Sequence, residues 1–152
     1  FVTHISFPPE LYENETLQGE TGIPKNLPPR DHDSHKGDYG KVLFIAGAAH
    51  YLGAPQFAAL SFLKAGGGLA YPATPKTIAP FLGSRARELV IHPLWETDTG
   101  SLSLKNRQGL LALCEGMDMV AMGPGVSLHP ETQDLMRTLA EKIPCPLLID
   151  GD

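Results

Sequence analysis

The chain has 152 residues, of which 42% are hydrophobic and 19% charged, a composition that excludes a disordered polypeptide. Its net charge of −5 argues against a nucleic-acid or anionic-membrane surface, because such surfaces require clustered Lys and Arg. No apolar stretch approaches the ~20 residues of a membrane-spanning helix, and Cys114 and Cys145 form no CxxC motif. We therefore expect a cytoplasmic domain with no nucleic-acid partner and no membrane partner.

The first 40 residues are predicted to be a tail and a linker. Residues 1–7 alternate partly like a strand, and Pro24, Pro28 and Pro29 keep the later part extended because proline fixes φ. A polar cluster follows at Asp31, His32, Asp33 and His35. Its spacing matches no standard zinc or calcium loop, which favours a solvated turn over a metal site. The chain begins without Met and ends directly after an apolar run, so we expect a piece of a longer polypeptide.

From Lys41 onward, short apolar runs alternate with helical segments. The predicted strands are residues 42–46, 69–73, 89–91, 117–122 and 146–150, and the predicted helices are residues 54–65, 77–82, 106–114 and 131–142. The helix over residues 54–65 is apolar nearly all round, which predicts deep burial. Pro130 stands at the first turn of the last helix, where proline is favoured. This alternation predicts an α/β fold with a mainly parallel central sheet and helices on both faces.

Three loops follow the carboxyl ends of predicted strands, where open α/β sheets bind ligands. Residues 47–54 enter a helix whose free N–H groups suit an anion, although the loop is neither a Walker A motif nor GxGxxG. Gly123 and Gly125 flank a proline, which allows either a close approach of a ligand to the backbone or simply a tight turn. Asp150 and Asp152 are suited to a hydroxyl group or a Mg²⁺-bound water, or they form a solvated acidic turn. The residues by themselves indicate a ligand-binding α/β domain.

Four motifs, taken together, are more specific. They are the HKGDYG run at residues 35–40 with its strand to Gly47, Gly53-Ala54, the AGGGL run at residues 65–69, and the MGPG run at residues 122–125. In this order and spacing, over residues 31–152, the sequence resembles the NAD(P)H-hydrate dehydratase family of the ribokinase-like superfamily. The resemblance implies that residues 1–30 are the end of a preceding NAD(P)H-hydrate epimerase-like domain and a linker. Residues 31–152 would be the N-terminal half of a ribokinase-like dehydratase domain, incomplete in this chain.

The resemblance also implies an activity, which is the repair of damaged nicotinamide cofactors. Members of the family are hydro-lyases that dehydrate the (6S) hydrates NADHX and NADPHX, a reaction driven by hydrolysis of ADP or ATP. The implied chemistry is phosphorylation of the hydrate hydroxyl and elimination of phosphate, assisted by Mg²⁺. Ala54 and Gly125 would contact the hydrated nucleotide, with Gly53, Gly123 and Asp150 beside them. A homo-oligomer, a tetramer or larger, is also expected.

One departure from the family pattern concerns catalysis. The family's catalytic aspartate lies in a late GTGD-type motif, which this sequence does not contain, so the catalytic residues are expected downstream of Asp152. We therefore expect the 152-residue polypeptide to be inactive by itself. Two alternatives stay open, a ribokinase-like kinase of a small molecule such as hydroxymethylpyrimidine, and a non-catalytic nucleotide-binding module. The sequence decides neither between ADP and ATP nor between NADHX and NADPHX.

Overall fold

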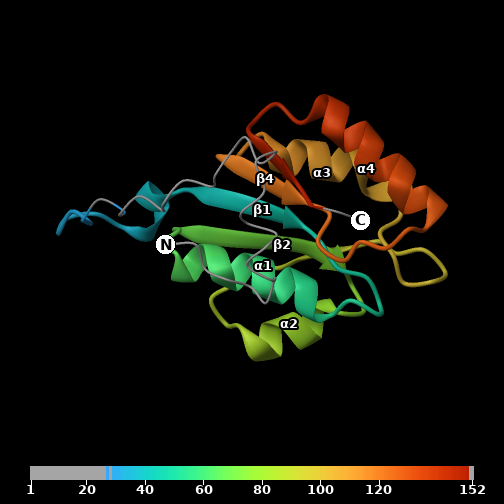
Figure 1. The fold of residues 1–152 in the computed structure, drawn as a ribbon, viewed down its shortest axis with the longest axis horizontal. Helices are drawn as coiled ribbons and strands as arrows, with labels where there is room; N and C mark the ends of the chain where they lie inside the picture. Colours follow the sequence, from blue (N-terminus) through green and yellow to red (C-terminus); the bar gives the residue numbers. More distant parts are fainter. Residues whose placement is uncertain (1–26, 28, 151–152) are drawn as a thin grey trace, which may run out of the picture. The chain divides into compact units, whose positions relative to one another are not determined.

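The computed structural model describes residues 27 and 29–150 (Figure 1), and the second of the two compact units of the chain starts at Asp33. Of the residues before Asp33, only 27 and 29–32 are described, and these contain neither a helix nor a strand. The strand predicted over residues 1–7 lies outside the described residues, and so does Asp152.

A single five-stranded sheet forms the centre of this unit. Its strands are β1 (Lys41–Ile45), β2 (Leu69–Pro75), β3 (His92–Leu94), β4 (Met119–Met122) and β5 (Leu147–Ile149). They lie in the order β3-β2-β1-β4-β5, and every neighbouring pair is parallel. The chain moves outward from β1 to β3 and then returns to place β4 on the other side of β1. The order therefore reverses between β1 and β4, which is where open α/β sheets bind ligands.

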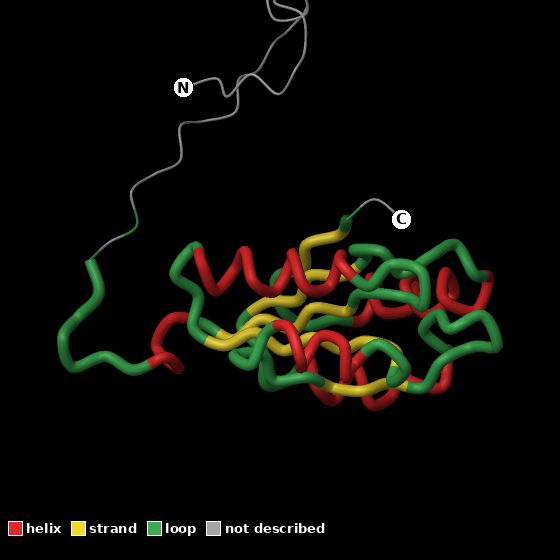
Figure 2. Tube along the Cα trace, turned by 90° about the horizontal axis from the view of Figure 1, so that it is seen from below, coloured by secondary structure: helices red, strands yellow, loops and turns green. Residues whose placement is uncertain are grey.

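Helices cover both faces of the sheet, as the sequence predicts. The helices are α1 (Gly53–Lys64), α2 (Ala79–Arg85), α3 (Arg107–Cys114) and α4 (Pro130–Lys142), with 3₁₀ turns η2 (Lys36–Tyr39) and η3 (Leu104–Asn106). Figure 1 shows α1 and α2 on one side of the strands and α3 and α4 on the other, and Figure 2 shows the strands between the helices. In the described part of the chain, no helix has the length and apolar character needed to cross a membrane.

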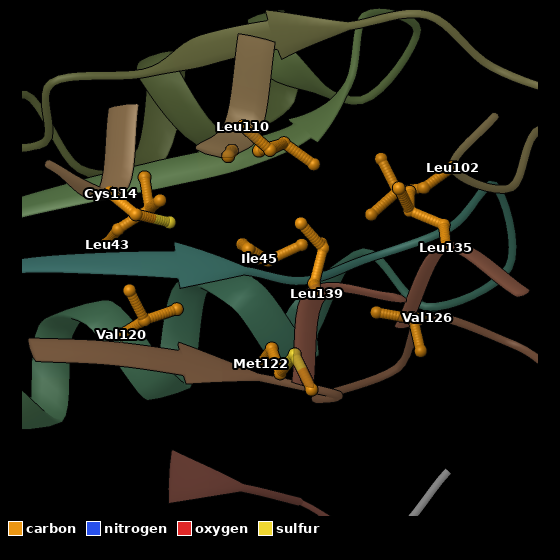
Figure 3. Packing of buried hydrophobic residues seen from close by; sticks show 11 residues of the cluster. Leu43, Ile45, Leu102, Leu110, Cys114, Val120, Met122, Val126, Leu135 and Leu139 are labelled. Carbon is orange, nitrogen blue, oxygen red and sulfur yellow. The ribbon is translucent and has the colours of Figure 1, made fainter. Parts of the chain in front are cut away.

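The buried strand β1 divides the core into two halves because its side chains alternate between the faces of the sheet. Leu43 and Ile45 point toward α3 and α4 and pack with Val120 and Leu139 (Figure 3). Val42 and Phe44 point the other way and pack with Ala59 of α1 and with the segment after α2. An apolar strand between two layers of helices is the arrangement expected of a parallel sheet.

The motifs at residues 35–40 and 65–69 contact each other at the amino-terminal edge of the sheet. The amides of Gly68 and Leu69 donate hydrogen bonds of 2.9 Å to the carbonyls of Tyr39 and Gly40. A Cβ at Gly68 would lie 1.9 Å from the carbonyl oxygen of Lys36, so the close packing of the two backbones requires glycine. Both motifs therefore shape the fold, at the edge opposite the carboxyl ends of the strands.

The structure corrects four sequence predictions. The strand expected at residues 89–91 begins three residues later, because Leu89 is buried in the core and the ladder with β2 runs through His92–Leu94. The helix expected at residues 77–82 is Ala79–Arg85, since a turn closed by the Ile78 amide on the Pro75 carbonyl comes first. Regular structure starts before Lys41, because Asp38 accepts a 2.9 Å hydrogen bond from the His35 amide and closes η2.

The fourth correction concerns the burial of α1. Only Pro55 and Ala59 of this helix are buried, and the Phe57 side chain is 74% exposed. One face of α1 rests on the sheet, whereas Phe57 lies on the opposite face. Nearly uniform apolarity therefore did not mean uniform burial.

Candidate functional site

Three loops meet at the carboxyl ends of β1, β4 and β5. The Gly47 amide donates to the Pro124 carbonyl at 2.9 Å, and the Gly123 amide donates to the Ile45 carbonyl at 3.1 Å. The Asp150 amide donates to the Met122 carbonyl at 2.9 Å. These bonds bring the loop after β1, the loop after β4 and the end of β5 together at the point where the strand order reverses.

Gly125 packs directly against the start of α1. A Cβ on this residue would lie 2.9 Å from the Ala54 Cβ and 2.7 Å from the Tyr51 Cβ, and its φ of +64° disfavours any residue with a side chain. Both Gly125 and Ala54 are half-buried, and because glycine has no side chain, the backbone of Gly125 reaches the surface. No side chain caps the N-terminus of α1 at Leu52, which leaves the first N–H groups of the helix without a side-chain acceptor.

The structure places the other predicted site residues at the same edge, with different constraints. Gly123 has a φ of +115°, and a Cβ there would lie 2.6 Å from the Asp150 carbonyl oxygen, so glycine lets the end of β5 approach. Asp150 itself is exposed. Gly53 is the first residue of α1, and a Cβ there would meet only the Phe57 ring, at 3.5 Å. Packing therefore requires glycine at positions 123 and 125 but would accept a side chain at Gly53.

A pocket of about 320 Å³ lies beside the contact between Gly125 and Tyr51. Its lining side chains include His50, Tyr51, Thr99, Ser101, Ser127 and His129. Sequence reasoning pointed to the loops that carry His50, Tyr51 and Ser127 but missed the other three residues. Thr99 and Ser101 come from a hairpin, which is closed by an antiparallel bridge between Glu96 and Leu102.

That hairpin is fixed to both other loops. The Ala49 amide donates to the Gly100 carbonyl at 2.9 Å, and a Cβ at Gly100 would lie 2.5 Å from the Ala49 Cβ. On the other side, the Ser101 and Ser127 hydroxyl oxygens are 2.6 Å apart. The turn residues Thr97-Asp98-Thr99-Gly100 are the sequence signal that would have identified this wall of the pocket.

His129, which also lines the pocket, caps α4. Its Nδ1 accepts a 3.3 Å hydrogen bond from the Glu131 amide, and its Nε2 lies 3.6 Å from the Asp98 carboxylate. Hydrogen bonds from the Ser103 hydroxyl and the Leu104 amide lower the pKa of Glu131, which holds its carboxylate against η3. Glu131 is thus an anion that anchors η3 to α4.

The described residues do not provide a metal centre. No group of three or more His, Cys, Asp or Glu side chains gathers closely enough among residues 27 and 29–150 to hold a metal ion. Burial raises the pKa of the Cys114 thiol to about 11, so this side chain is a neutral core residue at ordinary pH.

Comparison with known proteins identifies the family of this chain. The sequence model of the NAD(P)H-hydrate dehydratase family matches residues 42–152. The chain belongs to this family. It is also 49% identical over 152 residues to the bifunctional NAD(P)H-hydrate repair enzyme Nnr of Thermofilum pendens, covering 100% of this chain and 29% of that protein. The ATP-dependent (S)-NAD(P)H-hydrate dehydratase of Arabidopsis thaliana is 34% identical over 139 residues, which are 82% of this chain and 38% of that protein.

The fold is shared with solved ribokinase-like proteins. A crystal structure of the ADP/ATP-dependent NAD(P)H-hydrate dehydratase from Bacillus subtilis, co-crystallized with ATP/Mg²⁺, superposes with a TM-score of 0.61 at 24% identity. The match covers 82% of this chain and 42% of that one. This chain thus spans 29–42% of the length of these relatives, and its ribokinase-like fold agrees with the sequence prediction.

Proposed function

We propose that the full-length protein is an ADP- or ATP-dependent NAD(P)H-hydrate dehydratase that returns (6S)-NAD(P)H hydrate to NAD(P)H. The residues described above would form part of the site for the hydrated nucleotide. The observation that carries this proposal is the packing of Gly125 on Ala54 and Tyr51 where the strand order reverses. Gly125 is half-buried and has no side chain, which suits the close approach of a large ligand to its backbone.

Each predicted site residue has a physical role in this proposal. Ala54 and Gly125 would contact the hydrated nucleotide, and Gly53 stands at the first position of α1, where no side chain caps the helix. Gly123 allows the end of β5 to approach, which brings the exposed Asp150 to the same edge. No catalytic residue is assigned among residues 27 and 29–150, because the GTGD-type motif is absent from this sequence.

The nucleotide co-substrate and Mg²⁺ are part of the same proposal. The Arabidopsis relative is named as ATP-dependent and the Bacillus neighbour was co-crystallized with ATP/Mg²⁺, which supports a nucleotide as phosphoryl donor. Phosphoryl transfer uses Mg²⁺ to neutralise phosphate charge. The described residues do not fit a Mg²⁺ site by themselves, so no step is assigned to the metal here.

Two further properties extend the proposal beyond the site. The Thermofilum relative is named as bifunctional, which supports a fusion with NAD(P)H-hydrate epimerase, residues 1–30 being the end of that domain and a linker. The apolar Phe57 side chain is exposed on α1, a mostly apolar helix. This supports a homo-oligomer, a tetramer or larger, in which α1 contributes to the interface. A cytoplasmic location is proposed because the substrates are metabolic cofactors.

The proposed activity is tested with full-length protein, chemically hydrated NADPH and either ADP or ATP in the presence of Mg²⁺. Recovery of NADPH absorbance that depends on a nucleotide is the expected result. Accumulation of a phosphorylated hydrate without NADPH would instead indicate a kinase that does not complete the elimination. Binding of the nucleotide without any turnover would indicate a non-catalytic module.

A further inference from the structure

The pocket beside Gly125 has a chemistry that differs from the first turn of α1. We infer that it is a subsite for the uncharged nicotinamide-riboside part of the hydrated dinucleotide, bound through the hydroxyls of Ser101 and Ser127, and that it receives no phosphate. This inference rests on the proposed function and deepens it. Its location supports it, because Tyr51 both lines the pocket and lies under Gly125.

The loop that carries Ser127 is held in an unusual conformation. Among the described residues, Ser127 is the one non-glycine residue with a positive φ, at +72°. A non-glycine residue in this region costs about 1–2 kcal/mol and persists only where its surroundings hold it, most often at ligand sites. Here the Ser101 hydroxyl at 2.6 Å and the His129 amide at 3.4 Å from the Ser127 Oγ hold it. The strain therefore fixes one hydroxyl at the wall of the pocket.

The same wall is anchored to α4, so its two hydroxyls keep their positions. The buried Thr132 hydroxyl donates to the Leu102 carbonyl at 2.8 Å, and the Glu131 carboxylate accepts from the Leu104 amide at 2.8 Å. Ser101, which is 3% exposed, lies at the base of the hairpin between these contacts. A hydroxyl both donates and accepts, and a pair of them matches the adjacent hydroxyls of a ribose.

Two observations disfavour a phosphate in this pocket. No Lys or Arg lines it, and the Asp98 carboxylate lies 3.6 Å from the imidazole of His129. At the N-terminus of α4, moreover, Pro130 has no N–H, and the Glu131 and Gln133 amides donate to the side chain and carbonyl of His129. With no cation among its lining residues and a carboxylate beside it, this pocket suits an uncharged group.

The size of the pocket agrees with one nucleoside. Small-molecule sites occupy about 300–1,000 Å³, so 320 Å³ lies at the lower end and holds only a part of a dinucleotide. The exposed Tyr51 ring and the His50 and His129 rings give flat surfaces for a heteroaromatic base. The 2′-phosphate of NADPH is on the ribose of its adenosine half, which lies outside this pocket. The pocket therefore binds the NADH and NADPH forms of the substrate equally.

The test uses full-length protein and four probes: NADH, NADPH, reduced nicotinamide mononucleotide and AMP. Affinities are measured by titration calorimetry for the wild type, Ser127→Gly and Ser101→Ala. Ser127→Gly removes the hydroxyl and accepts the positive φ without strain, so it is expected to fold. Ser84→Ala is the matched control, because Ser84 is exposed on α2 and bonds only the Phe81 carbonyl.

We expect each pocket variant to weaken NADH, NADPH and reduced nicotinamide mononucleotide by the same factor, about 3–10-fold, and to leave AMP unchanged. A larger loss for NADPH than for NADH would overturn the inference by placing the 2′-phosphate here, and a loss for AMP would assign the pocket to adenosine. Unchanged affinities in both variants, with normal hydrate turnover, would overturn the inference and leave the proposed function intact. A wild type that neither turns over hydrate nor binds NADH and NADPH would overturn both.

Discussion

Replacing Gly125 by alanine tests the packing on which the candidate site depends. The new methyl group would lie 2.7 Å from the Tyr51 Cβ and 2.9 Å from the Ala54 Cβ, so the loop after β4 must move away from α1. A φ of +64° costs an alanine about 1–2 kcal/mol, and overpacking costs typically about 1–3 kcal/mol more. We expect the free energy of unfolding to fall by about 2–5 kcal/mol.

The displaced loop is also expected to impair the site. Misplacing ligand contacts by about 1 Å can lower rates by roughly 100-fold, so we expect kcat/KM for the hydrate to fall about 10–100-fold in full-length protein. Gly109→Ala on α3 is the matched control, since nothing lies within 4 Å of its Cβ position. There, alanine is expected to stabilise the helix by about 0.5–1 kcal/mol.

Urea unfolding and hydrate turnover, measured on both variants, decide the outcome. Adding Ala54→Gly to Gly125→Ala removes one of the two colliding methyl groups and is expected to recover part of the lost stability, as a coupling between touching residues. If Gly125→Ala matched Gly109→Ala in stability and turnover, the tight contact between the loop after β4 and α1 would be refuted.

Further predictions concern the core, the titration of a thiol and assembly. The Thr74 hydroxyl is buried without a hydrogen-bond partner, so Thr74→Val is expected to raise the free energy of unfolding by about 1 kcal/mol. Thr132→Val, which loses a bond to the Leu102 carbonyl, should lower it by a similar amount, and equal urea midpoints for the two variants would contradict this. The raised pKa of Cys114 means that the unfolded thiol ionises first, so stability should fall as the pH rises from about 9 to about 11. Urea midpoints across this range should show a smaller fall in Cys114→Ala, and identical pH profiles would refute the assignment. Phe57→Ser should shift the oligomer toward smaller species in light scattering, and an unchanged mass would argue against an interface at α1.

Much of the fold could be predicted because its signals are local. Strand β1 is a continuous apolar run, and Gly47 follows its end. Gly66 likewise follows the end of α1. Strand β3 was misplaced because Leu89-Val90-Ile91 has the stronger strand composition, while the pairing with β2 uses His92–Leu94. Composition shows which residues are apolar, but the register of a ladder decides which of them pair.

The candidate site divides in the same way. Gly123 and Gly125 are visible in the sequence because glycine next to proline after a buried strand is a turn signal. Ser101 and His129 were missed because their position depends on contacts between segments far apart in the chain, such as the pair Ser101–Ser127. A positive φ at a serine leaves no mark in the sequence either, so the strained Ser127 could be found only in the structure.

The most direct test of the proposed site is a crystal structure of the full-length protein with NADPH, the product of the proposed reaction, bound. We expect the nucleotide to contact Gly125 and Ala54, with its nicotinamide riboside beside Ser101 and Ser127. Density for NADPH elsewhere, with Gly125 still packed on Tyr51 and free of ligand, would contradict the assignment of this edge of the sheet as the substrate site.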